Sequence, residues 1–248
     1  MQDYLVFQLY APLVSWGEQA VGQERPSADH PSRSALLGLI AAALGIDRTD
    51  DDKHAQLSSQ CRFGTKLYSP GLAMRDFHTS QVPPSNKKTQ HLYTRKDELN
   101  EPKIGTILSF RTYQQDSYNV VGLWLESESI TWSLKELQTA LNQPHFQLYL
   151  GRKSCPLALP LNPLVTESDS LRDALDQYEI KTADNLASIL CNTKNIRYYW
   201  EDSQSIGMEG QHSYQTQRYD QPISRQRWQF ASRDEYVALG REEDNVSQ

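Results

Sequence analysis

Hydrophobic and polar positions alternate along several short segments of the chain, a pattern typical of strands with one buried face. In the first segment, residues 4–10, Leu5, Phe7 and Leu9 share a side. The turn Ser69-Pro70-Gly71 is predicted to join two further strands as a pair. The strands predicted after the first one, up to residue 160, are 63–68, 72–78, 106–113, 120–126 (paired with 106–113) and 146–150.

Two other segments have helical patterns. Residues 35–44 are apolar nearly all round, which predicts a buried helix that Ser32 or Ser34 caps and Gly45 closes. The sequence Ser-Leu-Lys-Glu from Ser133 is a capping box, which predicts the start of a second helix. Residues 47–53, between these helices, are acidic and predicted to be a surface loop.

The order strand, helix, strand pair, strand pair, helix, strand predicts an α+β fold with a ferredoxin-like (RRM-like) βαββαβ core. Residues 79–103 are polar, contain prolines and have no core face, so they are an insertion into that core. Residues 161–240 are predicted to form a smaller, mostly β part, with helices at 171–178 and 183–190 and strands at 196–200, 214–219 and 226–230. The predicted organisation is thus a domain at 1–160, a C-terminal region at 161–240 and a flexible tail at 241–248.

Composition removes several classes of protein. The 248 residues carry a net charge of −6 and only 38% hydrophobic residues, which excludes a histone-like polycation. The N-terminal sequence lacks the features of a secretory signal, and the longest apolar stretch is shorter than the ~20 residues of a membrane span. Three widely spaced cysteines indicate a cytoplasmic protein with reduced thiols, and the six histidines have no metal-ligand spacing. We therefore expect no metal, no cofactor and no membrane contact.

Charge is distributed unevenly along the chain. Residues 62–103 contain eight basic and four acidic residues, a net of +4, interleaved with His78, His91 and Tyr93. Residues 218–233 contain four arginines and one aspartate, a net of +3, beside Tyr219 and Trp228. Cations mixed with aromatic rings suit a flexible RNA strand, which offers phosphates and bases. The alternative is a solvated surface with incidental charge.

Two segments could bind a phosphate group. Residues 151–156, Gly-Arg-Lys-Ser-Cys-Pro, offer backbone amides and two cations after a predicted strand, although they lack P-loop spacing and could be an ordinary basic turn. Residues 31–34, Pro-Ser-Arg-Ser, stand at a predicted helix N-terminus, where Ser34 can donate and Arg33 can fork onto a phosphate. Plain helix capping explains the second segment equally well.

Catalytic patterns are sparse. The chain has no GxSxG, HExxH or GxGxxG motif. A metal-independent RNA cleavage could use a base, an acid and a cation such as Tyr68, His91 and Lys88. A protein with 13 tyrosines and six histidines supplies such a trio by chance, so we predict no catalytic residues.

Three collinear segments resemble one known family. They are residues 11–17 (APLVSWG), 31–46 (PSRSALLGLIAAALGI) and 149–161 (YLGRKSCPLALPL). Together they are similar to the CasD-type subunits of type I-E Cascade complexes, within the RAMP superfamily of CRISPR proteins. The resemblance extends to about residue 163 and is weaker beyond.

The resemblance implies a non-enzymatic subunit that caps the 5′ handle of the CRISPR RNA in antiviral defence. Its partners would be that RNA and the backbone, large and other subunits of the ribonucleoprotein, with target DNA only indirectly. Residues 79–103 would be the thumb that reaches over the RNA. The RNA-binding candidates are Trp16, Gln19, Arg25, Arg33, Ser34, Arg75, Lys87, Lys88, His91, Arg95, Arg152 and Lys153.

Two other functions stay open. In the related type I-C class the subunit itself cuts precursor RNA with tyrosine, lysine and histidine, which makes a metal-independent endoribonuclease the main alternative. A protein-interaction module without an RNA role is the third possibility.

Overall fold

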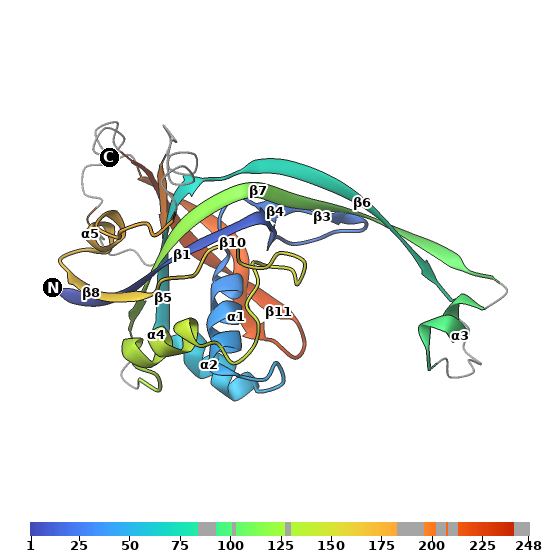
Figure 1. Cartoon of the computed structure of the whole chain (residues 1–248), viewed down its shortest axis with the longest axis horizontal. Coiled ribbons are helices and arrows are strands. Elements are labelled where there is room, and N and C mark those ends of the chain that lie inside the picture. The colour runs from blue at the N-terminus through green and yellow to red at the C-terminus, as the bar shows by residue number, and fades with distance from the viewer. Residues whose placement is uncertain are drawn as a thin grey trace.

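The computed structural model of the chain describes residues 1–83, 93–100, 103–126, 130–182, 196–201, 207 and 213–240. It is a mixed α+β protein built on a mostly antiparallel sheet (Figure 1). Seven strands follow one another in the order β10-β11-β9-β5-β7-β1-β8, and β3 and β6 also pair with β7. A small separate sheet joins β2 (Trp16–Gly17) to β4 (Ser27–Ala28).

The centre of the sheet is β7 (Gly105–Leu125), a 21-residue strand. On one edge it pairs with β1 (Gln2–Val14) and, in parallel, with β3 (Glu24–Arg25). On the other edge β5 (Cys61–Ser69) and β6 (Leu72–Val82) lie end to end. The two predicted strand pairs are therefore wrong: 106–113 and 120–126 are one strand, and β5 and β6 both pair with it.

Gly71 allows the turn between β5 and β6 to keep the chain on the same edge of β7, so that β6 continues where β5 ends. Its φ is +77°, and a Cβ there would lie 2.2 Å from the backbone oxygen of Gln115. Only glycine tolerates this backbone angle and this close approach without strain.

Three helices cover one face of the sheet (Figure 1). As predicted, α1 (Arg33–Leu44) is capped by Ser32, whose Oγ accepts a hydrogen bond from the Ala35 amide at 3.2 Å, and ends at Gly45 with φ +75°. The predicted capping box opens α4 (Leu134–Asn142). The expected loop at 47–53 is partly wrong, because Asp50 caps an additional helix, α2 (Asp51–Gln60).

The opposite face carries a second core. Leu5, Phe7 and Leu9 of β1 pack with α1 and α4, whereas Tyr4 and Val6 point the other way, into a tyrosine-rich cluster. That cluster includes residues of α5 (Leu171–Asp176), which confirms the predicted helix at 171–178. The central strands are apolar on both sides because each side is covered.

The predicted strand at 146–150 is wrong. This segment forms only an isolated bridge between Tyr149 and Pro156, and the strand beside β1 is β8 (Leu164–Ser168). Further along, β9 (Arg197–Trp200) pairs with β5 and with β11 (Gln229–Leu239).

The hairpin of β10 (Ser213–Ser224) and β11 completes the sheet. The strands predicted at 196–200 and 214–219 are confirmed, whereas most of 226–230 is the hairpin turn. The predicted helix at 183–190 and the tail 241–248 lie outside the described residues. The predicted division at residue 160 stays a prediction, and strands on both sides of it pair in one sheet.

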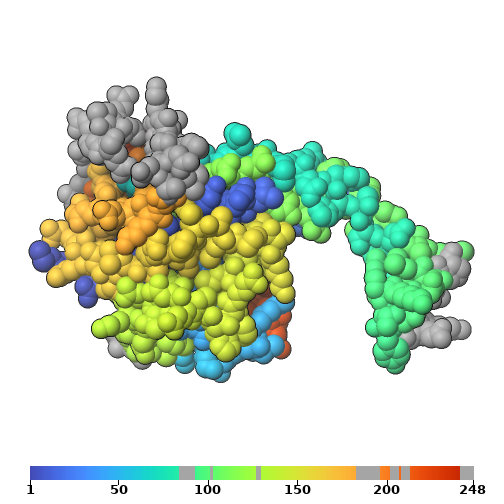
Figure 2. Space-filling model, viewed as in Figure 1, coloured from blue at the N-terminus to red at the C-terminus, as the bar shows by residue number. Residues whose placement is uncertain are grey.

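The outer parts of β6 and β7 form an arm that projects from the body and carries α3 (Arg95–Leu99) near its tip (Figures 1 and 2). The described residues of the predicted insertion, 79–83, 93–100 and 103, lie at the outer end of this arm. None of these residues is buried, as expected for a segment without a core face. Among the described residues, no helix is long and apolar enough to cross a membrane.

Candidate nucleic-acid interface

The three segments singled out in the sequence meet at one cavity of about 490 Å³. The first contributes Ser15 and Gly17, the second contributes Ser32 and Ser34 at the start of α1, and the third contributes Tyr149, Gly151 and Arg152. The α1–α2 loop and the turn of the β10–β11 hairpin complete the wall with Asp47, Arg48, Arg225 and Trp228.

The glycine-rich segment turns sharply against β1. Gly151 has φ +87°, and a Cβ there would lie 1.8 Å from the backbone oxygen of Ser15. The turn is closed by hydrogen bonds from the Leu150 amide to the Cys155 carbonyl and from the Cys155 amide to the Arg152 carbonyl, both 2.8 Å. These backbone contacts hold Arg152 at the cavity, and they require glycine at position 151.

Replacing Gly151→Ala is expected to displace this turn and lower the free energy of unfolding by at least about 2 kcal/mol, because both the backbone angle and the space exclude a methyl group. Denaturant unfolding measures the effect. Gly17→Ala is the matched control, because Gly17 lines the same cavity with nothing within 4 Å of a Cβ and should change stability by less than about 0.5 kcal/mol. Equal effects of the two changes would contradict this account of the turn.

Arg152 lies at the junction of the cavity and the arm. Its guanidinium carbon is 4.6 Å from the centre of the Tyr113 ring on β7, a cation–π contact. Its Nη1 atom is buried and makes no hydrogen bond to described residues. The neighbouring Lys153 is exposed. Arg152 therefore lines the cavity with a hydrogen-bond donor that no described residue satisfies.

Arg225 and Arg48 add positive charge at the start of α1. Arg225 Nη2 donates to the backbone oxygen of Ser34, and its guanidinium lies 3.4 Å from where a Cβ on Gly38 would be. Burial lowers the pKa of Arg225, and the nearby charge of Arg48 lowers it further. Within the described ranges, neither of these arginines, nor Arg152, forms an ion pair with a carboxylate. An anion in the cavity would relieve this accumulation of positive charge.

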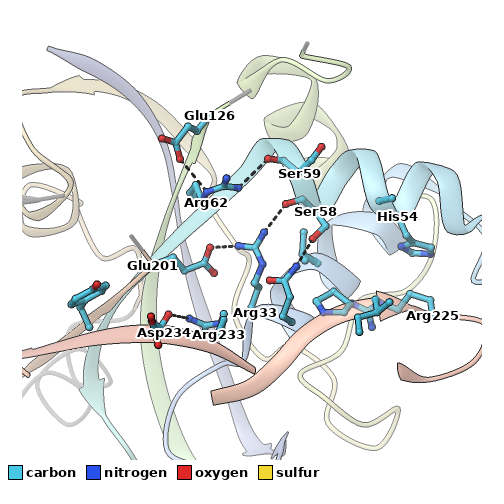
Figure 3. A pocket seen from close by; sticks show the side chains of 16 residues that line it. Arg33, His54, Ser58, Ser59, Arg62, Glu126, Glu201, Arg225, Arg233 and Asp234 are labelled. Atoms are coloured by element: carbon cyan, nitrogen blue, oxygen red, sulfur yellow. Dashed lines mark hydrogen bonds and ion pairs between the residues drawn. The ribbon is translucent and has the colours of Figure 1, made fainter. Parts of the chain in front are cut away.

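Arg33 lies apart from this group. Its side chain is 4% exposed, Nη1 donates to Glu201, and Nη2 donates to the backbone oxygen of Ser58 at 2.6 Å, as Figure 3 shows. Nη2 also donates to the backbone oxygen of Cys61 at 3.1 Å. In this arrangement the guanidinium of Arg33 is occupied by Glu201 and by two backbone oxygens, and its phosphate contact stays a prediction.

Arg33 reaches a second, larger cavity of about 850 Å³ between α2 and the β10–β11 hairpin (Figure 3). There Arg62 is 3.0 Å from Glu126 and Arg233 contacts Asp220, whereas Arg225 lines both cavities. The smaller cavity is the better candidate for an anion, because Arg48 and Arg152 add to Arg225 there.

The other predicted contacts are dispersed. Trp16 is buried at 2% exposure, Gln19 is exposed on the following loop, and Arg25 donates to the backbone oxygens of Gly22 and Glu24. On the arm, Arg75 pairs with Glu24 at 2.6 Å, and Arg95 pairs with Glu98 at 2.6 Å. Lys87, Lys88 and His91 lie outside the described residues.

The second basic stretch is mostly structural. Arg218 and Arg233, whose side chains are 12% exposed, pair with the buried Asp220 and Glu235, so the turn at 225–228 is the part of this stretch that lines the cavity. Arg48 was missed because it follows an aspartate in an acidic loop, where nothing in the sequence marks it. Of the three residues considered for RNA cleavage, Tyr68 is buried in the tyrosine-rich core, and His91 and Lys88 are outside the described residues.

This geometry can be compared with known proteins. A family model described as CRISPR-associated protein (Cas_Cas5) matches residues 4–236. The chain belongs to this family. It is 32% identical to "CRISPR system Cascade subunit CasD" of Escherichia coli (strain K12), with 97% of each chain covered.

Two solved structures have a similar fold. A chain of a "CRISPR RNA-guided surveillance complex" gives a TM-score of 0.65 at 24% identity, covering 95% of this chain and 89% of that one. A "Crystal structure of Cas protein" gives a TM-score of 0.60 at 25% identity, covering 97% and 96%. As a Cas5 family member, the chain keeps this fold over nearly its whole length.

Proposed function

We propose that this chain is the subunit of a Cascade-type CRISPR complex that holds the 5′ handle of the guide RNA. The observation that carries the proposal is the convergence of the three family-like segments on one cavity with three arginines that have no ion pair to a carboxylate among the described residues. The relative named as a Cascade subunit supports the same assignment.

The chemistry of the cavity suits a single RNA strand. Arginine forks and serine hydroxyls bind phosphate oxygens, and aromatic side chains stack on unstacked bases. Tyr149 and Trp228 line the cavity beside Arg48, Arg152 and Arg225. A strand in this position would also meet the inner part of the arm, because Arg152 stacks on Tyr113 of β7.

We further propose that the sheet contains a ferredoxin-like core. Its four strands would be β1, β5, β7 and β8, in the spatial order β8-β1-β7-β5 with every neighbour antiparallel. The crossovers through α1 and α4 link β1 to β5 and β7 to β8. In this assignment β6 and the outer half of β7 are the thumb, and the strands after residue 196 are the C-terminal addition.

The subunit is proposed to bind without cutting. A cleaving subunit would need a base and an acid close to the RNA phosphate. The cavity is lined mainly by arginines, serines and aromatic rings, and of its two other titratable groups, His54 and Asp47, the His54 ring already lies 3.2 Å from the backbone oxygen of Asp47. Incubating the purified chain with repeat RNA in EDTA tests this assignment. Site-specific cleavage that is lost in His91→Ala would establish the endoribonuclease alternative instead.

The RNA contact is tested by Arg152→Ala in the assembled complex. Each phosphate contact on a single strand contributes about 0.7 to the slope of log affinity against log salt. Guide-RNA binding measured from low to high salt should therefore weaken and lose about that much of its slope.

Arg62→Ala is the matched control, because Arg62 is paired with Glu126 outside the cavity and should leave the slope unchanged. Circular dichroism of both variants verifies folding. Identical salt dependence of the wild-type and Arg152→Ala complexes would remove Arg152 from the RNA site.

A further inference from the structure

The turn between β10 and β11 contains an unusual tryptophan. Trp228 has φ +57°, in the left-handed region. The other non-glycine residues with positive φ among those described are Asp116 and Asn162, both of types that tolerate this conformation. A bulky side chain there is strained, and glycine would be the stable choice.

The rest of the turn is held firmly in place. Asp51, at the start of α2, accepts hydrogen bonds from Ser224 Oγ at 2.7 Å and from the backbone amide of Arg225 at 3.0 Å. Ser224 Oγ in turn accepts from the Arg227 amide at 3.1 Å. These contacts bridge the hairpin to α2 without involving the indole, so the turn does not depend on the Trp228 ring for its anchorage.

Burial does not explain the tryptophan either. Its side chain is 59% exposed, although tryptophan usually loses most of its surface on folding. The Arg48 guanidinium lies 5.0 Å from the ring centre, and the Phe230 ring meets it edge-on at 5.4 Å. An exposed, strained aromatic residue that rests on an arginine has the features of a ligand platform.

We propose that Trp228 is a stacking platform for one unstacked base of the guide RNA. This inference rests on the proposed function, because Trp228 lines the same cavity as Ser34, Arg152 and Arg225. The charge of the cavity selects the ligand: an aromatic surface beside arginines that no carboxylate in the described part of the chain pairs with fits a nucleotide, whose base stacks while its phosphate meets the guanidinium groups. The cation–π contact of Arg48 with the Trp228 ring helps to hold the ring in place.

The decisive variant is Trp228→Gly, assembled into the complex. Glycine adopts φ +57° freely, so the melting temperature of the free chain should stay equal or rise. Guide-RNA affinity should fall by about 5- to 100-fold, the cost of losing one base–aromatic stack. A purely structural tryptophan would instead lower the melting temperature and the affinity together, which would overturn the proposal.

A second measurement identifies the base. Guide RNAs carrying 2-aminopurine at one handle position at a time should show one position whose fluorescence is quenched in the wild-type complex and recovers in Trp228→Gly. Trp228→Phe should retain part of the quenching, because a smaller ring still stacks.

The outcomes separate this inference from the proposed function. Normal RNA affinity in Trp228→Gly, with the expected loss in Arg152→Ala, would reject the platform and keep the RNA site. Loss of a neighbouring protein subunit from the Trp228→Gly complex, with RNA binding intact, would assign the tryptophan to a protein interface and reject the platform. RNA binding that is unaffected by either variant would reject both.

Discussion

Glu201→Ala is expected to lower the free energy of unfolding by about 3–5 kcal/mol, because it leaves the guanidinium of Arg33 buried without its counter-charge. Both side chains are less than a tenth exposed. Burial raises the pKa of Glu201 while the charge of Arg33 opposes that rise, so the carboxylate depends on this partner for its charge. Denaturant unfolding at neutral pH measures the loss.

Two controls distinguish a buried ion pair from charge in general. The pair Arg62–Glu126 lies in the same part of the molecule but is more exposed, so Glu126→Ala should cost at most about 1 kcal/mol. The double variant Arg33→Met with Glu201→Leu fills the same space without charge and should recover most of the stability lost in Glu201→Ala. A Glu201→Ala cost no larger than that of Glu126→Ala would show that water or another group compensates Arg33.

The Arg33–Glu201 pair also bears on the RNA site. Arg33 is the first residue of α1, and its backbone amide donates to Asp220 of β10 at 2.8 Å. The pair therefore fixes the start of α1 against the C-terminal strands, and the cavity lies between these same elements. RNA binding that survives in the repacked double variant would confirm that Arg33 positions the site without contacting phosphate.

The sequence predicts the elements whose signals are local. A cap at Ser32 and a stop at Gly45 define α1, and the capping box at Ser133 defines α4, because each depends on hydrogen bonds within one turn. Strand partners are not local. Alternation reveals the strands 63–68 and 72–78 but cannot show that both lie along β7, which is decided by the close approach of Gly71 to Gln115 and by packing far along the chain.

The same distinction applies to the site. The three segments could be singled out because together they resemble one family, and two of them also carry a helix-start or turn pattern. The structure brings all three to one cavity. Whether an arginine forms an ion pair depends on carboxylates that are distant in the chain. Glu201 pairs with Arg33, whereas Arg152 contacts the Tyr113 ring. Neither outcome can be read from local sequence.

Acid is expected to destabilise the protein through Glu235 of β11. Burial alone would raise the pKa of Glu235, but the hydrogen bond and charge of His30, together with Arg218 and Arg233, outweigh it and lower the pKa to about 2, from an ordinary value of 4.5. His30 Nε2 lies 3.0 Å and Arg233 Nη2 2.8 Å from the carboxylate oxygens. The ionised form is thus favoured more in the folded chain than in the unfolded one.

This difference sets the direction of the pH dependence. The folded chain binds fewer protons at this site, so Glu235 contributes about 3 kcal/mol to stability at neutral pH, and the contribution is lost as pH falls from about 4.5 towards 2. Chemical unfolding of wild type and Glu235→Gln across this range isolates the residue from other carboxylates. The two stability curves should converge as pH decreases, because protonated glutamate resembles glutamine; curves that stay parallel would show that His30 and the arginines do not hold Glu235 ionised.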